Sequence, residues 1–185
     1  IDWQDTYREI QPELVMLNKP SVFSSPYEDM ISNEFDFKKT SKPEKVCEIC
    51  TESTDIVFID QTIMNRNNER LIKKIRGISP NVLISLLLSP PLPEGLSELP
   101  IDNLMLKPID YSEFKTEITY LQSRSGLTKE ERKYVSLQSK MATIRTLHGK
   151  SAEAKSVYRK CKDQIEEIAL PKSRQKSLDN ILADK

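Results

Sequence analysis

The chain has 185 residues, which is enough for one well-packed core or for one domain with a smaller attachment. Charged residues make up 30% of the sequence and hydrophobic residues 37%, as is typical of a soluble globular protein with a strongly charged surface. The 28 basic and 28 acidic residues cancel, so only a local basic patch could attract DNA or an anionic membrane. No apolar run approaches the roughly 20 residues of a membrane span. The three cysteines, an odd number, indicate a reducing cytoplasm.

Short apolar runs and helical patterns alternate along the first two thirds of the chain. Residues 1–12 carry no clear pattern and are treated as an N-terminal extension. Residues 55–60, Asp-Ile-Val-Phe-Ile-Asp, contain four consecutive apolar residues, which suits a strand buried on both faces of a parallel sheet. The same reasoning predicts strands at residues 13–17, 35–37, 82–88 and 104–106.

The predicted helices between these strands begin at capping signals. Residues 25–28, Ser-Pro-Tyr-Glu, place a serine at the N-cap and a proline at the first helical position, and Ser41 opens a similar signal. Asp110 caps a helix that extends to residue 121. Four prolines within residues 90–100 leave room only for a brief helical turn at residues 94–99. The longer helices are expected at residues 25–33, 41–50, 67–77 and 110–121.

This alternation indicates an α/β fold for residues 13–122, with a doubly wound, five-stranded parallel sheet. Asp60 ends the third strand of that sheet. Open α/β sheets place their functional sites at the carboxyl ends of the strands. Asp60 is therefore the first candidate for a functional residue.

After residue 126 the pattern is helical throughout. Residues 128–131, Thr-Lys-Glu-Glu, form a capping box, and Ser151 caps a second helix that ends before Pro171. We interpret residues 127–170 as an antiparallel α-helical hairpin and residues 171–185 as a tail with one short helix at residues 177–183.

Each helix of the hairpin carries a narrow apolar seam with spacings of three and four residues. A hairpin cannot bury such seams by itself, so they must pack on the sheet or on another chain. We expect them to be contact or self-association faces. The seam residues are Tyr134, Leu137, Met141 and Ile144 on the first helix, and Ala154, Tyr158, Cys161, Ile165 and Ile168 on the second.

Two stretches of the chain resemble known families. The five-fold strand–helix pattern, Asp60 after the third strand and Lys107-Pro108 after the fifth resemble a response-regulator receiver domain. That resemblance implies that Asp60 is the phosphoacceptor and that Lys107 pairs with it or with its phosphoryl group. Residues 132–142, Arg-Lys-Tyr-Val-Ser-Leu-Gln-Ser-Lys-Met-Ala, resemble the HalX domain, a helical module that follows receivers in archaeal regulators.

The receiver resemblance fails at the positions that support phosphorylation. The acidic pair that holds Mg²⁺ aligns with Asn18 and Lys19. The hydroxyl residue of the fourth strand aligns with Leu86, or with Ser85 after a slip of one residue, and the aromatic switch residue aligns with Leu104. Without the metal, phosphoryl transfer loses the charge neutralisation on which it relies.

The sequence therefore predicts a degenerate receiver in which Asp60 has a structural role. A carboxylate at a strand end can pair with Lys107 or accept a hydrogen bond from a loop amide. Cys47 and Cys50 have the spacing of a redox motif but lie within a predicted helix, and the single histidine, His148, leaves no zinc site. Basic residues near the C-terminus are expected to be solvated surface charges. These are Arg159, Lys160, Lys162, Lys172, Arg174 and Lys176.

From these observations we expect a cytoplasmic, non-enzymatic signalling protein without cofactor or metal. It would act through a protein partner, or through self-association, at the helical hairpin. One alternative is a regulator of transcription that uses Mg²⁺ and is phosphorylated on Asp60 by a sensor kinase. Another is a regulator that binds DNA through its helical region.

Overall fold

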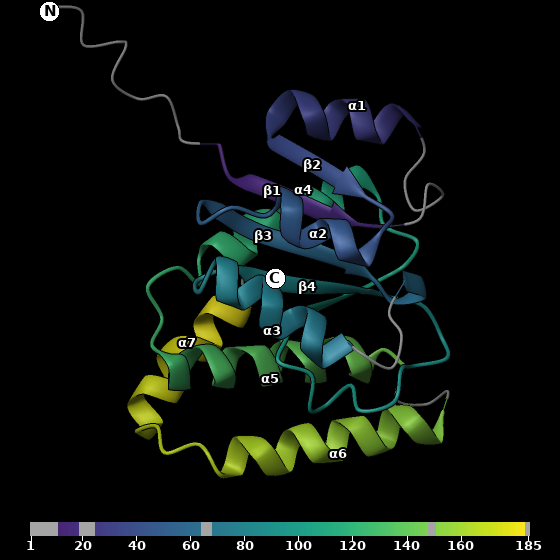
Figure 1. Cartoon of the computed structure of the whole chain (residues 1–185). Coiled ribbons are helices and arrows are strands. Elements are labelled where there is room, and N and C mark those ends of the chain that lie inside the picture. Colours follow the sequence, from purple (N-terminus) through teal and green to yellow (C-terminus); the bar gives the residue numbers. More distant parts are fainter. Residues whose placement is uncertain (1–10, 19–24, 64–67, 148–150, 184–185) are drawn as a thin grey trace, which may run out of the picture.

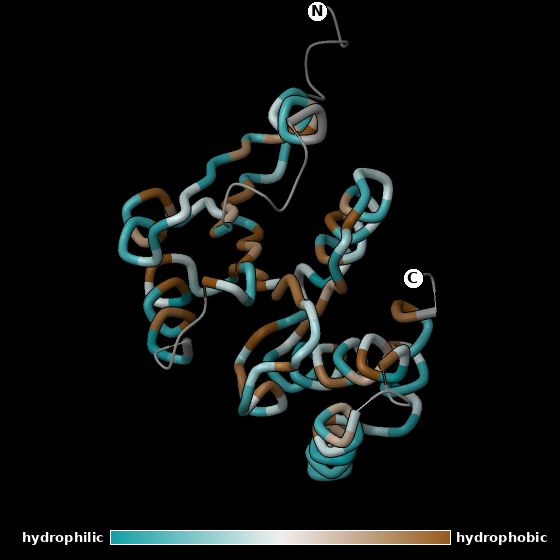
Figure 2. The backbone as a smooth tube through the Cα atoms, turned by 90° about the vertical axis from the view of Figure 1, so that its right-hand side faces the viewer, coloured by the Kyte–Doolittle hydropathy of each residue, from teal (hydrophilic) through white to brown (hydrophobic). Residues whose placement is uncertain are grey.

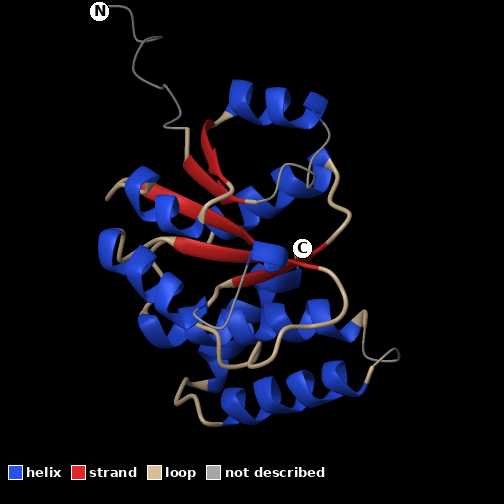
Figure 3. Cartoon of the chain, turned by 45° about the vertical axis from the view of Figure 1, so that its right-hand side comes forward, coloured by secondary structure: helices blue, strands red, loops and turns tan. Residues whose placement is uncertain are grey.

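Five parallel strands form a sheet at the centre of the molecule (Figures 1 and 3). The computed structural model describes residues 11–18, 25–63, 68–147 and 151–183. The strand order is β2-β1-β3-β4-β5, which is the flavodoxin-like order of doubly wound sheets, so the predicted fold class is confirmed. The strands are β1 (Glu13–Leu17), β2 (Asp36–Thr40), β3 (Thr54–Asp60), β4 (Leu83–Leu88) and β5 (Asn103–Leu106).

Helices cover both faces of this sheet. They are α1 (Ser25–Glu34), α2 (Pro43–Ile49), α3 (Asn68–Ile78), α4 (Tyr111–Gln122), α5 (Lys129–Arg145), α6 (Ala152–Glu166) and α7 (Lys172–Ala183). One core lies under α1 and α4, and a second core lies under α2, α3, α5 and α6. In Figure 2 α6 is seen nearly end-on, with its hydrophilic residues turned away from the sheet. None of the helices in the described ranges is both long and apolar enough to cross a membrane.

Most of the predicted caps are present. Asp110, Thr128 and Ser151 each accept a hydrogen bond from a backbone amide in the first turn of their helix, at 2.7, 3.3 and 3.0 Å. The cap predicted at Ser41 is wrong. Helix α2 begins two residues later, so that Lys42 occupies the N-cap and forms no side-chain cap.

The crossover from β4 to β5, residues 89–102, consists of turns rather than a helix. Its prolines prevent a continuous helix. The carbonyl oxygen of Gly95, which has a φ of 69°, accepts from the amides of Glu98 and Leu99 at 3.0 and 3.2 Å, and this is the brief helical turn that was expected. The part of the sheet that a crossover helix would cover is therefore left for another element.

Helix α5 fills this gap and lies along β5, the edge strand of the sheet. Thr143 Oγ1 donates to the carbonyl oxygen of Leu104 at 3.1 Å, and Lys140 Nζ donates to the carbonyl oxygen of Leu99 at 2.7 Å. Ser139, beside them on the same stripe, is fully buried. An uncovered edge strand presents unpaired backbone groups to solvent and to other chains. On β5, the carbonyl oxygen of Leu104 is paired with a hydroxyl group of α5, that of Thr143.

The apolar seam of α5 is covered within the chain, by the sheet core at Leu137, Met141 and Ile144 and by α7 at Tyr134, which corrects the expectation that this seam is a contact face for a partner. The four seam residues on α5 are at most 8% exposed: Tyr134, Leu137, Met141 and Ile144. The physical reason is the missing crossover helix, because the sheet face beneath α5 needs an apolar cover. The second seam is divided between Ala154 and Cys161 of α6, which are fully buried, and the half-buried residues Tyr158 and Ile165 of α6 and Ile168 just after it.

The tail helix α7 packs on α5. It begins at Lys172, five residues before the predicted start, and its Leu178 is fully buried in a small cluster with α5. Tyr134 of α5 donates from its hydroxyl to Asp179 Oδ1 at 2.9 Å. The tail is therefore part of the folded helical region.

Candidate functional site

The Asp60 carboxylate lies at the carboxyl end of β3, the middle strand of the sheet. Side chains of β3 alternate between the two cores. Asp60 is the last residue of this strand, which has a neighbouring strand on each side, and it is 0% exposed. Its Oδ1 accepts a hydrogen bond from the amide of Thr62 at 2.8 Å. This bond closes the turn into the short 3-10 helix η2 (Gln61–Ile63).

Lys107, which directly follows β5, is the charge partner of Asp60. Its Nζ lies 2.9 Å from Oδ1 and 3.1 Å from Oδ2, and its side chain is 17% exposed. Both structural roles expected for Asp60, the ion pair and the amide cap, are therefore present together. Both carboxylate oxygens accept hydrogen bonds from this one ammonium, which compensates the charge of Asp60.

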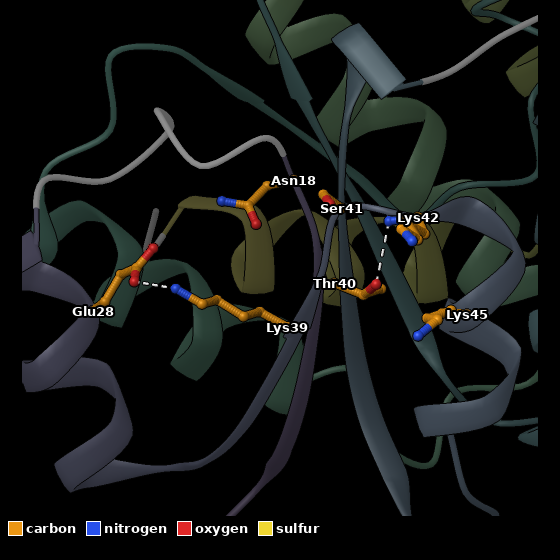
Figure 4. Close-up of a pocket in the computed structure, with 7 residues that line it drawn as sticks. All are labelled: Asn18, Glu28, Lys39, Thr40, Ser41, Lys42 and Lys45. Atoms are coloured by element: carbon orange, nitrogen blue, oxygen red, sulfur yellow. Dashed lines mark hydrogen bonds and ion pairs between the residues drawn. The ribbon is translucent and has the colours of Figure 1, made fainter.

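Asn18, at one of the two positions where the receiver pattern has an acid, follows β1. It is 4% exposed, and its Nδ2 has no hydrogen-bond partner among the described residues. Asn18 lines a cavity of about 320 Å³ on the β2 side of β1, where Lys39 forms an ion pair with Glu28 (Figure 4). The other predicted position, Lys19, lies outside the described residues.

This corner of the sheet does not fit a receiver-type Mg²⁺ site. Magnesium requires several oxygen ligands in near-octahedral geometry, usually with carboxylates among them. The described residues offer the carboxylate of Asp60, which pairs with Lys107, the amide of Asn18, and in the adjoining cavity the carboxylate of Glu28, which pairs with Lys39. Within the described ranges no three His, Cys, Asp or Glu side chains form a group that could hold a metal ion. The described residues at this corner therefore do not support phosphoryl transfer through a bound metal ion.

The predicted switch positions lie away from Asp60. Leu86 and Leu104 belong to the core beneath α5. In the register of β3 and β4, Asp60 lies opposite Leu87, which is apolar. Ser85 is two residues earlier on β4 and fully buried. The register position opposite Asp60 therefore carries no hydroxyl group.

Gln61 connects this corner to the crossover. Its Oε1 accepts from the amide of Ser89 at 2.9 Å, and its Nε2 donates to the carbonyl oxygen of Pro91 at 2.6 Å. The sequence carries no signal for these contacts, because a glutamine after a strand has no periodicity or spacing that indicates its partners.

A second buried ion pair lies at Asp102, at the end of the crossover. Unlike the pair of Asp60 and Lys107, it was not predicted from the sequence. Its carboxylate is 2% exposed in the side chain and accepts from Arg132 Nε at 2.7 Å and from Arg76 Nη2 at 2.8 Å. Burial alone would raise the pKa of Asp102, but the hydrogen bonds and charge of Arg132, together with the charge of Arg76, hold this pKa below its usual value. Asp102 thus joins α3 and α5 to the sheet.

Comparison with known proteins finds similarity by sequence and by structure, and no family model matches the sequence. A protein of Haloferax volcanii named "Putative transcriptional regulator" is 25% identical over 93 residues, which are 50% of this chain and 16% of that protein. The chain therefore spans only a small part of the relative's length.

Two solved structures have TM-scores of 0.49. An adenylate cyclase from Rhodopirellula baltica is 18% identical and covers 61% of this chain and 89% of its own. A "Putative pilus assembly-related protein" from Burkholderia pseudomallei is 11% identical, with coverages of 65% and 96%. The fold assignment above depends on the strand order and not on these likenesses.

Proposed function

We propose that this chain is a non-enzymatic signalling regulator whose receiver-like domain has lost its phosphorylation switch. The proposal depends on one observation. Asp60 is fully buried, both of its oxygens are bonded to Lys107, and Asn18 takes the place of an acid that would recruit a metal. We infer that this carboxylate, without a neighbouring acid to hold a metal ion, supports the fold and does not accept a phosphoryl group.

The regulatory part of the proposal is supported by the Haloferax relative, whose name describes a regulator of transcription. It is also supported by the resemblance of residues 132–142 to a module that follows receiver domains. In this chain two polar residues of that stretch attach α5 to the domain, Ser139 to Asn103 of β5 and Lys140 to Leu99 of the crossover. The output of the protein would then come from the surface of the docked helices.

We infer that this output is contact with another protein. The outer face of α6 is exposed and carries both signs of charge, among them Arg159, Lys162 and Asp163. The exposed large hydrophobic side chain of the described residues, Met30, lies on α1 and not on this face of α6. A partner would therefore meet a mainly polar, charged helical surface, supplemented by the half-buried Ile165 and Ile168.

The loss of the switch can be tested with beryllofluoride, which mimics a phosphoryl group on an aspartate. The 185-residue chain would be titrated with beryllofluoride and Mg²⁺ and followed by amide NMR spectra, with Asp60→Asn as the matched control. We expect no saturable change in either protein. A saturable change in the natural chain that is absent from Asp60→Asn would show that Asp60 accepts phosphoryl groups and would refute the proposal.

Binding to DNA is a second candidate function, favoured by the name of the Haloferax relative. The six basic residues near the C-terminus that were expected to be solvated charges are the candidates for phosphate contacts, and two of them are in ion pairs, Lys160 with Glu98 and Arg174 with Glu131. Phosphate contacts would make binding fall steeply with salt. A mobility shift that is absent, or that does not respond to salt, would remove this candidate.

A further inference from the structure

A cavity of about 560 Å³ lies between α5, α6 and the end of the β4–β5 crossover. It forms where the crossover runs as a loop against α5. Its volume falls within the range of roughly 300–1,000 Å³ that is usual for small-molecule sites. Part of the lining is apolar, with Leu99, Ile101 and Leu137 from the adjoining core.

Cations outnumber acids in the buried wall of this cavity. Asp102 already pairs with two arginines, Arg76 and Arg132, and Lys140 adds a third cation that is 3% exposed. The other acid in the lining, Glu98, is 52% exposed in its side chain and pairs with a lysine of α6 at 2.9 Å. A buried wall with surplus positive charge is stabilised by a bound anion.

Lys140 is a buried cation of the cavity wall whose donors are only partly used by the protein. An ammonium carries three N–H donors. In the described part of the chain, one of them bonds to the carbonyl oxygen of Leu99 at 2.7 Å, and no other bond is present. Ser136, one turn earlier on α5, is 7% exposed and its hydroxyl forms no hydrogen bond within the described ranges. Residues spaced by four positions share one helix face, so both groups line the same wall.

We propose that this cavity binds a small organic carboxylate with an apolar body. The carboxylate accepts hydrogen bonds from Lys140 and Ser136, and the body packs on Leu99, Ile101 and Leu137. The apolar lining favours such a ligand over inorganic phosphate, which would leave that surface uncovered. The site does not involve Asp60, so the proposal stands apart from the proposed function. The ligand would contact both the crossover and α5 and would stabilise their docking.

Calorimetric titration of the 185-residue chain with 2-naphthoate tests the proposal, with 2-naphthamide as a neutral ligand of the same shape. We expect saturable binding of one naphthoate per chain and at least tenfold weaker binding of the amide. Lys140→Met, which keeps the apolar stem of the side chain, should weaken naphthoate binding at least tenfold. Lys155→Met, at an exposed position of α6 outside the cavity lining, should leave it unchanged.

A measurement on the natural chain keeps the test independent of whether Lys140→Met folds. Burial lowers the pKa of Lys140 to about 8, while Cys161 of α6 and the crossover acids Asp102 and Glu98 act to raise it and Arg76 of α3 acts to lower it. A carboxylate beside the ammonium raises this pKa, so binding at pH 8 should take up a fraction of a proton. Titrations in buffers with different ionisation enthalpies measure that uptake.

The proposal is overturned by any of four results. These are no saturable binding of naphthoate, equal binding of the amide, full affinity in a folded Lys140→Met, and binding at pH 8 without proton uptake.

Discussion

Replacement of Lys107 by methionine isolates the contribution of the Asp60 ion pair to stability. Methionine keeps most of the apolar stem of the lysine and removes the ammonium. At the observed 2.9 Å, and with an effective dielectric constant near 20, the attraction between the two charges is about 6 kcal/mol. Removal of one partner from a buried pair costs about 3–5 kcal/mol. Because the Lys107 side chain is 17% exposed and water can reach it, we expect a loss near the lower end, about 3 kcal/mol.

Urea unfolding followed by far-UV circular dichroism at pH 7 measures this loss. The free energy of unfolding would be compared among the natural chain, Lys107→Met, Asp60→Asn and the double variant. The double variant should be more stable than the sum of the single losses predicts, by at least about 1 kcal/mol, because the two groups are in contact. A loss below about 1 kcal/mol for Lys107→Met, or strictly additive losses, would refute the conclusion that this pair supports the fold.

Two further predictions concern the docking of α5. Because the pKa of Asp102 is lowered in the folded chain, its stabilising effect is complete above its ordinary pKa of about 4 and is lost as the pH falls through the lowered value. Asp102→Asn should therefore lower the free energy of unfolding in urea by about 3 kcal/mol at pH 7. The difference between the two proteins should become smaller in acid, and a difference that does not change with pH would contradict the stabilising role of the ionised Asp102. Thr143→Val removes the bond to the Leu104 carbonyl and should cost about 1 kcal/mol by the same assay. Thr146→Val, whose hydroxyl bonds only within its own helix, should change stability by less than about 0.5 kcal/mol, and equal effects of the two valines would contradict the edge role of α5.

The elements of the fold could be predicted from the sequence because their signals are local. Apolar runs gave the strands, and capping residues such as Asp110 and Thr128 gave the helix starts within a residue or two. The pairing of Asp60 with Lys107 could be predicted because Asp60 ends β3 and Lys107 follows β5, and the carboxyl ends of parallel strands lie at the same edge of the sheet. At Ser41 the same kind of local signal failed, because the serine stands one residue before the actual N-cap.

The arrangement of the C-terminal helices could not be predicted, because it depends on contacts between residues far apart in the chain. Arg132 reaches Asp102 across 30 positions, and Thr143 reaches Leu104 across 39. No periodicity in the sequence indicates such partners. The apolar stripe of α5 was visible, but the stripe alone does not distinguish a helix that meets a partner from one that meets its own sheet.

The β4–β5 crossover explains why the helical region is joined so closely to the sheet. Its prolines exclude the helix that would otherwise cover β5, so the edge strand and the leucines beneath it need another cover. Helix α5 supplies apolar residues to that core and polar ones, Lys140 and Thr143, to backbone carbonyls of the crossover and the strand. Any event that loosens α5 therefore exposes the sheet, and any ligand between α5 and the crossover resists that loosening. We infer that a signal would act on the protein through this coupling, at the junction of sheet and helices and not at Asp60.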